Sequence, residues 1–213
     1  MIYVSLNKES FQYEIHELIK IFFFGREIIF IDSVEDYSGL GLLIEIRLME
    51  KGNKIDAIVK IYKDRELIVE NKEKDLQSIE IGEDNLKKKI RIGLKKGLHN
   101  ALSQISNTKA PWGVLTGIRP IKIAHSLLDN EVEEGDIRNI LLNQYKISSE
   151  KVNLIMDICK IQRPYLYPLD ENRFSLYIGI PFCPTRCLYC SFPSCNINHY
   201  AKYIDEYTDK LIY

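Results

Sequence analysis

The chain has 213 residues, of which 46% are hydrophobic and 28% charged, and its formal net charge is −1. This composition is typical of a globular protein, and the near-zero charge argues against nucleic-acid binding by overall electrostatics. The first ten residues lack the basic start and long apolar core of a signal peptide, and no apolar run is long enough to span a bilayer. We therefore predict a cytoplasmic protein with neither a membrane nor a nucleic acid as partner.

The first 70 residues predict a small α+β unit. Strand-like runs occupy residues 1–7, 27–32, 40–50, 54–63 and 65–71. The turn sequence "KGN" at 51–53 joins two of these runs and indicates a hairpin. Apolar residues recur at helical spacing over residues 9–22. Together these patterns predict an antiparallel sheet with one helix.

The next hundred residues predict mainly helices. A long helix would begin at the capping residue Asp84 and run to about Ile105, with an apolar face. That face is formed by Leu86, Ile90, Leu94, Leu98, Ala101, Leu102 and Ile105. Three shorter helices are expected near 120–129, 134–146 and 149–162, the last capped by Ser148 or Ser149, and residues 163–172 read as a linker. The predicted divisions of the chain are 1–108 (α+β), 109–170 (helical segment and linker) and 171–213.

Six basic residues crowd the long helix, and Lys87, Arg91 and Lys95 share one face. Two interpretations stay open. One is an anion site, for the carboxylates of a porphyrinogen or for RNA, and the other is a solvated helix face opposite the apolar one. The second is favoured, because charge runs are usually solvent faces. Arg119 precedes Pro120 at an expected helix start, where it could hold an anion or pair with an acidic side chain.

The sequence changes character after residue 172. Residues 173–180, "RFSLYIGI", predict a strand that is apolar on both faces, as in a parallel sheet. A cysteine-rich loop follows, and then a helix with Asn198 as its expected cap. This order is one β-loop-α unit, and its loop lies where parallel α/β units carry their functional residues.

The cysteine loop has the spacing Cys183-x3-Cys187-x2-Cys190. Three thiolates would leave one iron of a four-iron cluster without a protein ligand, whereas a structural zinc site prefers four ligands. Cys195 could supply a fourth ligand to zinc, which is the alternative, but we interpret it as a spectator. Cys159 lies on a predicted helix and is interpreted as a buried structural thiol.

These residues resemble a known family. The run "CPTRCLYC" resembles the CxxxCxxC signature of radical S-adenosylmethionine (SAM) enzymes. The preceding "LYIGIPFC" is similar to the branch that contains oxygen-independent coproporphyrinogen III oxidase. Upstream, "PWGVLTGIRPIKIAH" is similar to coproporphyrinogen dehydrogenase-like proteins.

The resemblance implies a set of cofactors and site residues. Cys183, Cys187 and Cys190 would hold a [4Fe–4S] cluster, SAM would bind the open iron, and Tyr177 and Tyr189 would contact SAM. It implies oxidative decarboxylation of coproporphyrinogen III propionates to vinyl groups in haem biosynthesis. A tetrapyrrole substrate and a reducing donor such as flavodoxin or ferredoxin would be the partners. No residue is assigned as catalytic, because the cofactor carries the chemistry.

The expected fold is therefore an α+β domain with an antiparallel sheet, a helical segment, and the first βα unit of a radical SAM (β/α) barrel. A complete barrel takes roughly 250 residues, so we expect this chain to be an N-terminal portion, inactive by itself, of a radical SAM oxidoreductase. Uncovered apolar strand surface is expected as well. Two other functions stay open: a haem-binding or trafficking protein of the same branch, and a non-catalytic interaction module.

Overall fold

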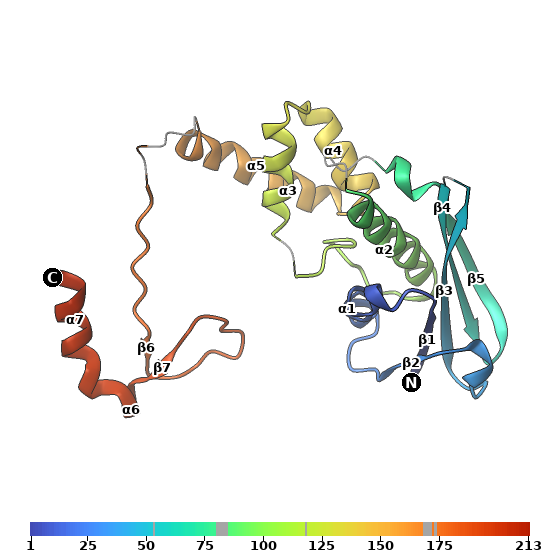
Figure 1. Ribbon diagram of the computed structural model, residues 1–213, viewed down its shortest axis with the longest axis horizontal. Coiled ribbons are helices and arrows are strands. Elements are labelled where there is room, and N and C mark those ends of the chain that lie inside the picture. The colour runs from blue at the N-terminus through green and yellow to red at the C-terminus, as the bar shows by residue number, and fades with distance from the viewer. Residues whose placement is uncertain (53, 80–84, 118, 168–171, 173) are drawn as a thin grey trace. The chain divides into compact units, whose positions relative to one another are not determined.

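The computed structural model describes residues 1–213 except 53, 80–84, 118, 168–171 and 173. Its contacts divide the chain into an N-terminal unit, Met1–Leu166, and a C-terminal unit, Tyr167–Tyr213. The N-terminal unit is a mixed α+β structure with a five-stranded sheet (Figure 1). Its strands are β1 (Ile2–Leu6), β2 (Ile28–Ile31), β3 (Leu42–Lys51), β4 (Lys54–Lys63) and β5 (Glu66–Glu73). Its α-helices are α1 (Gln12–Phe22), α2 (Leu86–Ile105), α3 (Pro120–Asp129), α4 (Glu134–Asn143) and α5 (Ser149–Leu166).

The sheet has the strand order β2-β1-β3-β4-β5 and is mixed, so the prediction of an antiparallel sheet is wrong in part. Strand β1 runs parallel to both β2 and β3, whereas β4 runs antiparallel to both β3 and β5. The physical reason is α1, which carries the chain back to the start of the sheet between β1 and β2 and so makes a βαβ crossover. The predicted hairpin does join β3 to β4, although Asn53 of its turn lies outside the described residues.

Alternation along the strands gives the sheet one apolar and one polar face. On β3, Ile44 and Ile46 are fully buried, and α1 and α2 lie against this face (Figure 1). The intervening residues face the other way. There the Arg47 guanidinium contacts the Glu45 carboxylate at 3.2 Å and donates to the Ser5 hydroxyl at 3.1 Å.

Two glycines let helix α2 approach the sheet and the turn that follows β5 closely. A Cβ on Gly93 would meet the Leu76 side chain, and one on Gly97 would lie 3.2 Å from Cγ of Glu73. Asn85 caps the helix by accepting a hydrogen bond from the Lys88 backbone N–H at 3.0 Å. The predicted cap, Asp84, lies outside the described residues.

The predicted apolar face of α2 is correct only from its middle onward. Leu94, Leu98, Ala101 and Leu102 are fully buried, but Leu86 is exposed. The first turn is therefore less covered than the rest of the helix. Lys95, predicted for a solvated face, is also buried, with a relative exposure of 3%.

Helices α3, α4 and α5 lie where the sequence predicts helices. The Ser148 hydroxyl accepts from the Lys151 N–H at 3.4 Å, so Ser148 rather than Ser149 is the side-chain cap. Helix α5 continues to Leu166 with Pro164 inside it, so the start of the predicted linker is helical. Cys159 on α5 is fully buried, which confirms its structural interpretation. No helix within the described ranges combines the length and the apolar character that a membrane span requires.

The loop between α2 and α3 crosses the backbone at the end of α4. The Val114 N–H donates to the Tyr145 carbonyl at 2.9 Å, and the Ser148 N–H donates to the Pro111 carbonyl at 2.9 Å. Gly113 makes this approach possible: its φ is +56°, and a Cβ there would overlap the Tyr145 carbonyl oxygen. The crossing fixes Val114 and Leu115 against the helices.

The strands and α-helices in the described part of the C-terminal unit are short. They are β6 (Phe182–Cys183), β7 (Cys195–Asn196), α6 (Ile197–Tyr200) and α7 (Ile204–Ile212). The predicted strand over 173–180 is wrong for residues 174–180, which have no regular structure; residue 173 lies outside the described set. A strand apolar on both sides needs neighbouring strands and covering helices, and the described residues of this unit form only the two-residue pair β6–β7.

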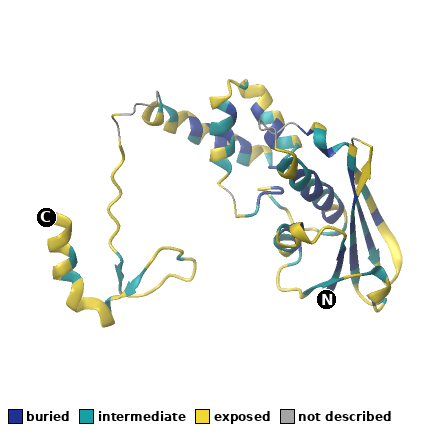
Figure 2. Cartoon of the chain, viewed as in Figure 1, coloured by how far each residue is buried: buried dark blue, intermediate teal, exposed yellow. Residues whose placement is uncertain are grey.

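Apolar side chains of the C-terminal unit are consequently exposed, as the sequence predicts (Figure 2). Phe174, Tyr177 and Ile180 are 89%, 78% and 74% exposed. The expected cap of the helix after the cysteine loop is displaced: the Asn196 side chain accepts from the Asn198 N–H at 2.9 Å, so Asn196 caps α6. The start of a radical SAM barrel is not confirmed, because these elements form no strand-helix layer.

Candidate functional site

The cysteine loop is closed at its base by main-chain pairing. Strands β6 and β7 run parallel, with Phe182 opposite Cys195 and Cys183 opposite Asn196. The Cys195 N–H donates to the Pro181 carbonyl at 2.8 Å. Residues 183–195 therefore form a closed loop whose two ends are paired. This closure limits how far apart the three predicted ligands can lie.

Helix α7 is attached to the base of this loop. The Tyr207 ring packs edge-to-face on Phe182, with ring centroids 5.4 Å apart. The Tyr207 hydroxyl also donates a hydrogen bond to the Gly179 carbonyl. These contacts link the segment before the loop to the helix after it, which is the local connection that the predicted β-loop-α order requires.

The three predicted ligands lie at different places on the loop. Cys183 is half-buried on β6, Cys187 is exposed, and Cys190 is half-buried. A turn joins the last two, because the Cys190 N–H donates to the Cys187 carbonyl at 3.0 Å. The Arg186 guanidinium donates to the Cys190 carbonyl at 3.4 Å and brings a positive charge into the loop. Within the described residues, no group of three or more Cys, His, Asp or Glu side chains is arranged to hold a metal ion.

The donor set nevertheless suits an iron–sulfur cluster. All of the cysteines are free thiols, and those of the loop are half-buried or exposed, so their side chains are not fixed by a core. Thiolates are the ligands that iron–sulfur clusters use, and three of them leave one iron for another ligand. Whether the three thiols bind one cluster stays a prediction.

Cys195 lies closer to the site than its spacing suggests. It lines a cavity of about 110 Å³ together with Cys183, Thr185 and Arg186. Sequence reasoning missed this proximity, because it depends on the β6–β7 pairing and not on the separation along the chain. The zinc alternative, with Cys195 as fourth ligand, therefore keeps a geometric basis.

The two predicted SAM-contacting tyrosines are exposed. Tyr177 lies in the extended stretch before the loop and is 78% exposed, and Tyr189 lies within the loop and is 89% exposed. Both rings are accessible to a ligand. Their assignment to SAM stays a prediction that rests on the resemblance.

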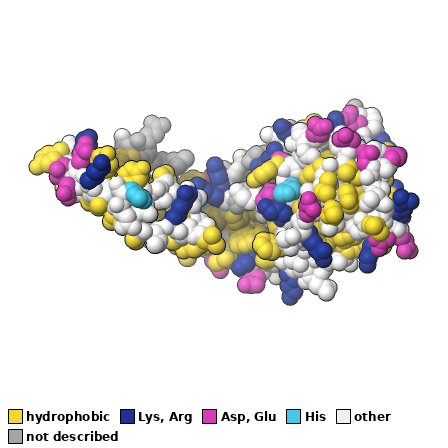
Figure 3. All heavy atoms as spheres, turned by 90° about the horizontal axis from the view of Figure 1, so that it is seen from below, with side chains coloured by type: hydrophobic (Ala, Val, Ile, Leu, Met, Phe, Trp, Pro, Cys, Tyr) yellow, Lys and Arg dark blue, Asp and Glu magenta, His cyan; other side chains and the backbone are white. Residues whose placement is uncertain are grey.

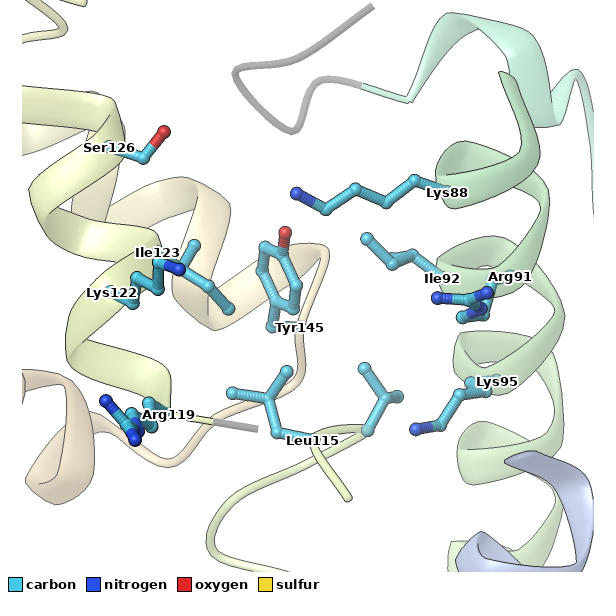
Figure 4. Close-up of a pocket in the computed structure, with 11 residues that line it drawn as sticks. Lys88, Arg91, Ile92, Lys95, Leu115, Arg119, Lys122, Ile123, Ser126 and Tyr145 are labelled. Carbon is cyan, nitrogen blue, oxygen red and sulfur yellow. The ribbon is translucent and has the colours of Figure 1, made fainter. Parts of the chain in front are cut away.

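A second candidate site lies in the N-terminal unit, between α2 and α3 (Figure 4). We call it the basic pocket. It has a volume of about 580 Å³ and is lined by apolar side chains and by five basic ones. The basic residues are Lys88, Arg91 and Lys95 from α2, and Arg119 and Lys122 at the start of α3.

Lys95 is the unusual group of the basic pocket. Its ammonium is buried and donates to the Thr116 hydroxyl at 2.8 Å. Burial lowers the pKa of Lys95 to about 8; Glu14 opposes this shift and Arg91 adds to it. Glu14 is itself ion-paired with Arg91 at 2.9 Å. The sequence marked Arg91, Lys95 and Arg119 as candidate anion ligands, but only the fold shows that they line one cavity.

Comparisons with known proteins bear on the family resemblance. Neither a protein family nor a solved structure matches the chain. A curated protein does match: 111 residues are 37% identical to "Oxygen-independent coproporphyrinogen-III oxidase-like protein HemZ" of Bacillus subtilis (strain 168). The resemblance to the coproporphyrinogen-III oxidase-like branch is confirmed. The match covers 51% of this chain and 22% of HemZ, so the chain spans about a fifth of that relative.

Proposed function

We propose that residues 183–195 hold a [4Fe–4S] cluster through Cys183, Cys187 and Cys190, with one iron left to bind SAM. The observation that carries the proposal is the spacing of these three thiols in a loop closed by β6–β7 pairing. The similarity to the HemZ protein supports it, because that relative is described as coproporphyrinogen-III oxidase-like.

The chain's own residues have simple roles in this proposal. The three thiolates bind the cluster, and the hydrogen bond from the Cys195 N–H to the Pro181 carbonyl keeps the loop closed around it. The exposed rings of Tyr177 and Tyr189 offer apolar surface on which SAM can lie. When bound, the cluster and SAM would supply one-electron chemistry for hydrogen abstraction from a substrate.

For the whole protein we propose an oxidoreductase that acts on a tetrapyrrole. The reaction would be oxidative decarboxylation of coproporphyrinogen III propionates to vinyl groups, with flavodoxin or ferredoxin as the reducing partner. This part of the proposal rests on the HemZ similarity, which extends over half of the chain.

Anaerobic reconstitution of the chain with iron and sulfide tests the cluster. We expect an electron paramagnetic resonance signal of a reduced [4Fe–4S] cluster that changes when SAM is added. Alanine substitution of Cys183, Cys187 or Cys190 should each abolish the signal. Cys195→Ala is the matched control, because it removes a thiol from the same loop and should leave the signal unchanged.

Three outcomes would overturn the proposal. Zinc binding that Cys195→Ala also abolishes would indicate a four-thiolate structural site. A cluster whose signal does not respond to SAM would remove the open-iron assignment. Haem binding by the reconstituted chain with no response to SAM would favour the haem-binding or trafficking function instead.

A further inference from the structure

We propose that the basic pocket between α2 and α3 binds a small organic anion that has an apolar body and two or more carboxylate or phosphate groups. This site lies in the N-terminal unit and is independent of the cysteine loop. The proposal therefore goes beyond the function proposed above and does not require it.

Charge is the first argument. Five basic side chains line the pocket, and no acidic residue is among its described lining residues. Lys88, Arg91 and Lys95 are three or four residues apart on α2, so they lie on one face of the helix. Arg119 and Lys122 approach from the first turn of α3, across the cavity (Figure 4). Glu14 pairs with Arg91 beside this lining, and the cluster of basic groups would still attract an anion.

The charged residues among the described lining of the pocket are all basic. The face of the molecule in Figure 3 carries basic and acidic side chains interspersed, in keeping with the net charge of −1. A solvated helix face would also leave its lysines exposed, whereas Lys95 is buried. The solvated-face interpretation is therefore wrong for Lys95, whereas Lys87 on the same face is exposed.

The burial of Lys95 is the second argument. An ammonium group out of water is costly unless an anion compensates it. Here its hydrogen bond goes to a neutral group, the Thr116 hydroxyl, at 2.8 Å. The carboxylate that influences it, Glu14, is ion-paired with Arg91. An anionic ligand would give this buried amine a charged partner that it otherwise lacks among the described residues.

The walls of the pocket are the third argument, because they define the rest of the ligand. Ile92, Val114 and Leu115 line it and are buried, and Tyr145 lies between the two helices (Figure 4). A volume of about 580 Å³ lies within the range of about 300–1,000 Å³ that small-molecule sites occupy. Apolar walls with basic groups around them favour an amphipathic anion over a simple inorganic one.

The wall is also held in place before any ligand binds. The close crossing at Gly113 and the bond from the Val114 N–H to the Tyr145 carbonyl position this side of the cavity. A wall that does not have to be ordered on binding lowers the entropic cost of association. Helix α3 begins at the same loop, and no side-chain hydrogen bond caps its N-terminus among the described residues. The partial positive charge of the helix dipole at that end adds to the attraction for an anion.

Binding measurements with three probes test the proposal. Isothermal titration calorimetry of the chain would use coproporphyrin III as the carboxylate probe, ATP as the phosphate probe, and inorganic phosphate as the simple ion. We expect saturable binding of at least one organic probe at a single site, weaker at high salt, and much weaker binding of inorganic phosphate. The two organic probes distinguish carboxylate from phosphate recognition.

Charge-removing variants locate the binding. Arg119→Gln combined with Lys122→Gln removes two exposed charges that line the pocket, so the fold should be preserved, and affinity should fall roughly tenfold or more. Lys87→Gln combined with Lys109→Gln is the matched control, since it removes the same charge from exposed residues outside the lining. That control should change the affinity less than roughly twofold.

Several results would overturn the proposal. They are no binding of either organic probe, equal losses in the pocket and control variants, or inorganic phosphate binding as tightly as the organic anions. Cys183→Ala offers a further distinction. It should abolish the cluster of the proposed function and leave anion binding intact, so the two proposals can fail separately.

Discussion

Many apolar residues are buried in the N-terminal unit of the chain, and many are exposed in the C-terminal unit. In the N-terminal unit, residues far apart in sequence, such as Ile15, Ile44 and Leu98, are fully buried in one core. In the C-terminal unit no described residue is buried, and Phe174 and Leu188 are almost completely exposed. Hydrophobic content alone therefore does not make a core, because a strand or helix needs a partner surface within reach.

The same difference separates the two candidate sites. The basic pocket is formed by side chains whose positions are set by packing and by the Gly113 crossing. The cysteine loop is held by one strand pair of two residues each and a few hydrogen bonds, and its thiols do not converge among the described residues. Binding of a cluster would supply the missing organisation, since metal binding and local folding are coupled.

The largest expected effect is in hydrogen exchange. Amides of β3 and α2 should exchange only through global unfolding, whereas amides of residues 174–180 should exchange almost as in an unfolded chain. We expect protection to differ by roughly a thousandfold or more, measured by exchange with mass spectrometry. Reconstitution with iron and sulfide should raise protection over residues 183–195. Equal protection in the two units before reconstitution would contradict the comparison.

The second prediction concerns the glycine that fixes the pocket wall. Gly113→Ala should destabilise the N-terminal unit by about 3 kcal/mol or more, because its Cβ would overlap the Tyr145 carbonyl oxygen and its φ is +56°. Chemical denaturation measures the loss.

Gly117→Ala is the control for that variant. Gly117 lies in the same loop with φ +65°, but a Cβ there meets nothing within 4 Å. It should cost only about 1 kcal/mol, which is the penalty of the left-handed backbone alone. Equal losses in the two variants would show that the close approach at Gly113 carries no energy of its own.

Much of the N-terminal fold could be predicted because its signals are local. The helical periodicity of residues 9–22, the three later helices and the β3–β4 hairpin all follow from spacing and turn residues. The parallel pairing of β1 could not be predicted, since it depends on where α1 returns the chain. The predicted strand is wrong over residues 174–180 for a related reason: its composition is that of a buried strand, but no strand pairs with it among the described residues of its unit.

In the candidate sites too, local features could be predicted from the sequence and long-range ones could not. The spacing of Cys183, Cys187 and Cys190 was visible because it is a short-range pattern, whereas the position of Cys195 at the loop base depends on strand pairing. The basic pocket joins α2 to the first turn of α3, and no sequence spacing shows that Lys95 and Lys122 line one cavity. A lysine within an apolar stretch of α2 was the one signal that could have indicated burial.

The third prediction uses the pH dependence of stability. The pKa of Lys95 is lowered by burial from its usual 10.5 to about 8, so between these values the folded state binds fewer protons than the unfolded state. Stability should therefore rise with pH in this window, by up to about 3 kcal/mol, as the buried charge is relieved. Denaturation at pH 7.5 and 9.5 measures the slope.

Lys95→Met isolates this contribution, because it keeps the apolar stem and removes the charge. The variant should be the more stable protein below pH 8 and should lose the rise. Exposed Lys210 in the C-terminal unit gives the contrast: its hydrogen bond to Glu206 raises its pKa. Identical pH profiles for the wild type and Lys95→Met would show that burial of Lys95 carries no energetic cost.

The fourth prediction compares two helix caps, and it concerns the smallest expected change in stability. Asn85 caps α2 by accepting from the Lys88 N–H at 3.0 Å, and Asn196 caps α6 by accepting from the Asn198 N–H at 2.9 Å. Asn85→Ala should lower the unfolding free energy by about 1 kcal/mol, because α2 belongs to the cooperative core. Asn196→Ala removes an equivalent hydrogen bond, yet it should leave the thermal transition of the N-terminal unit unchanged. A shift of that transition by Asn196→Ala would mean that the two units unfold together, and the contrast between them would then be one of exposure and not of stability.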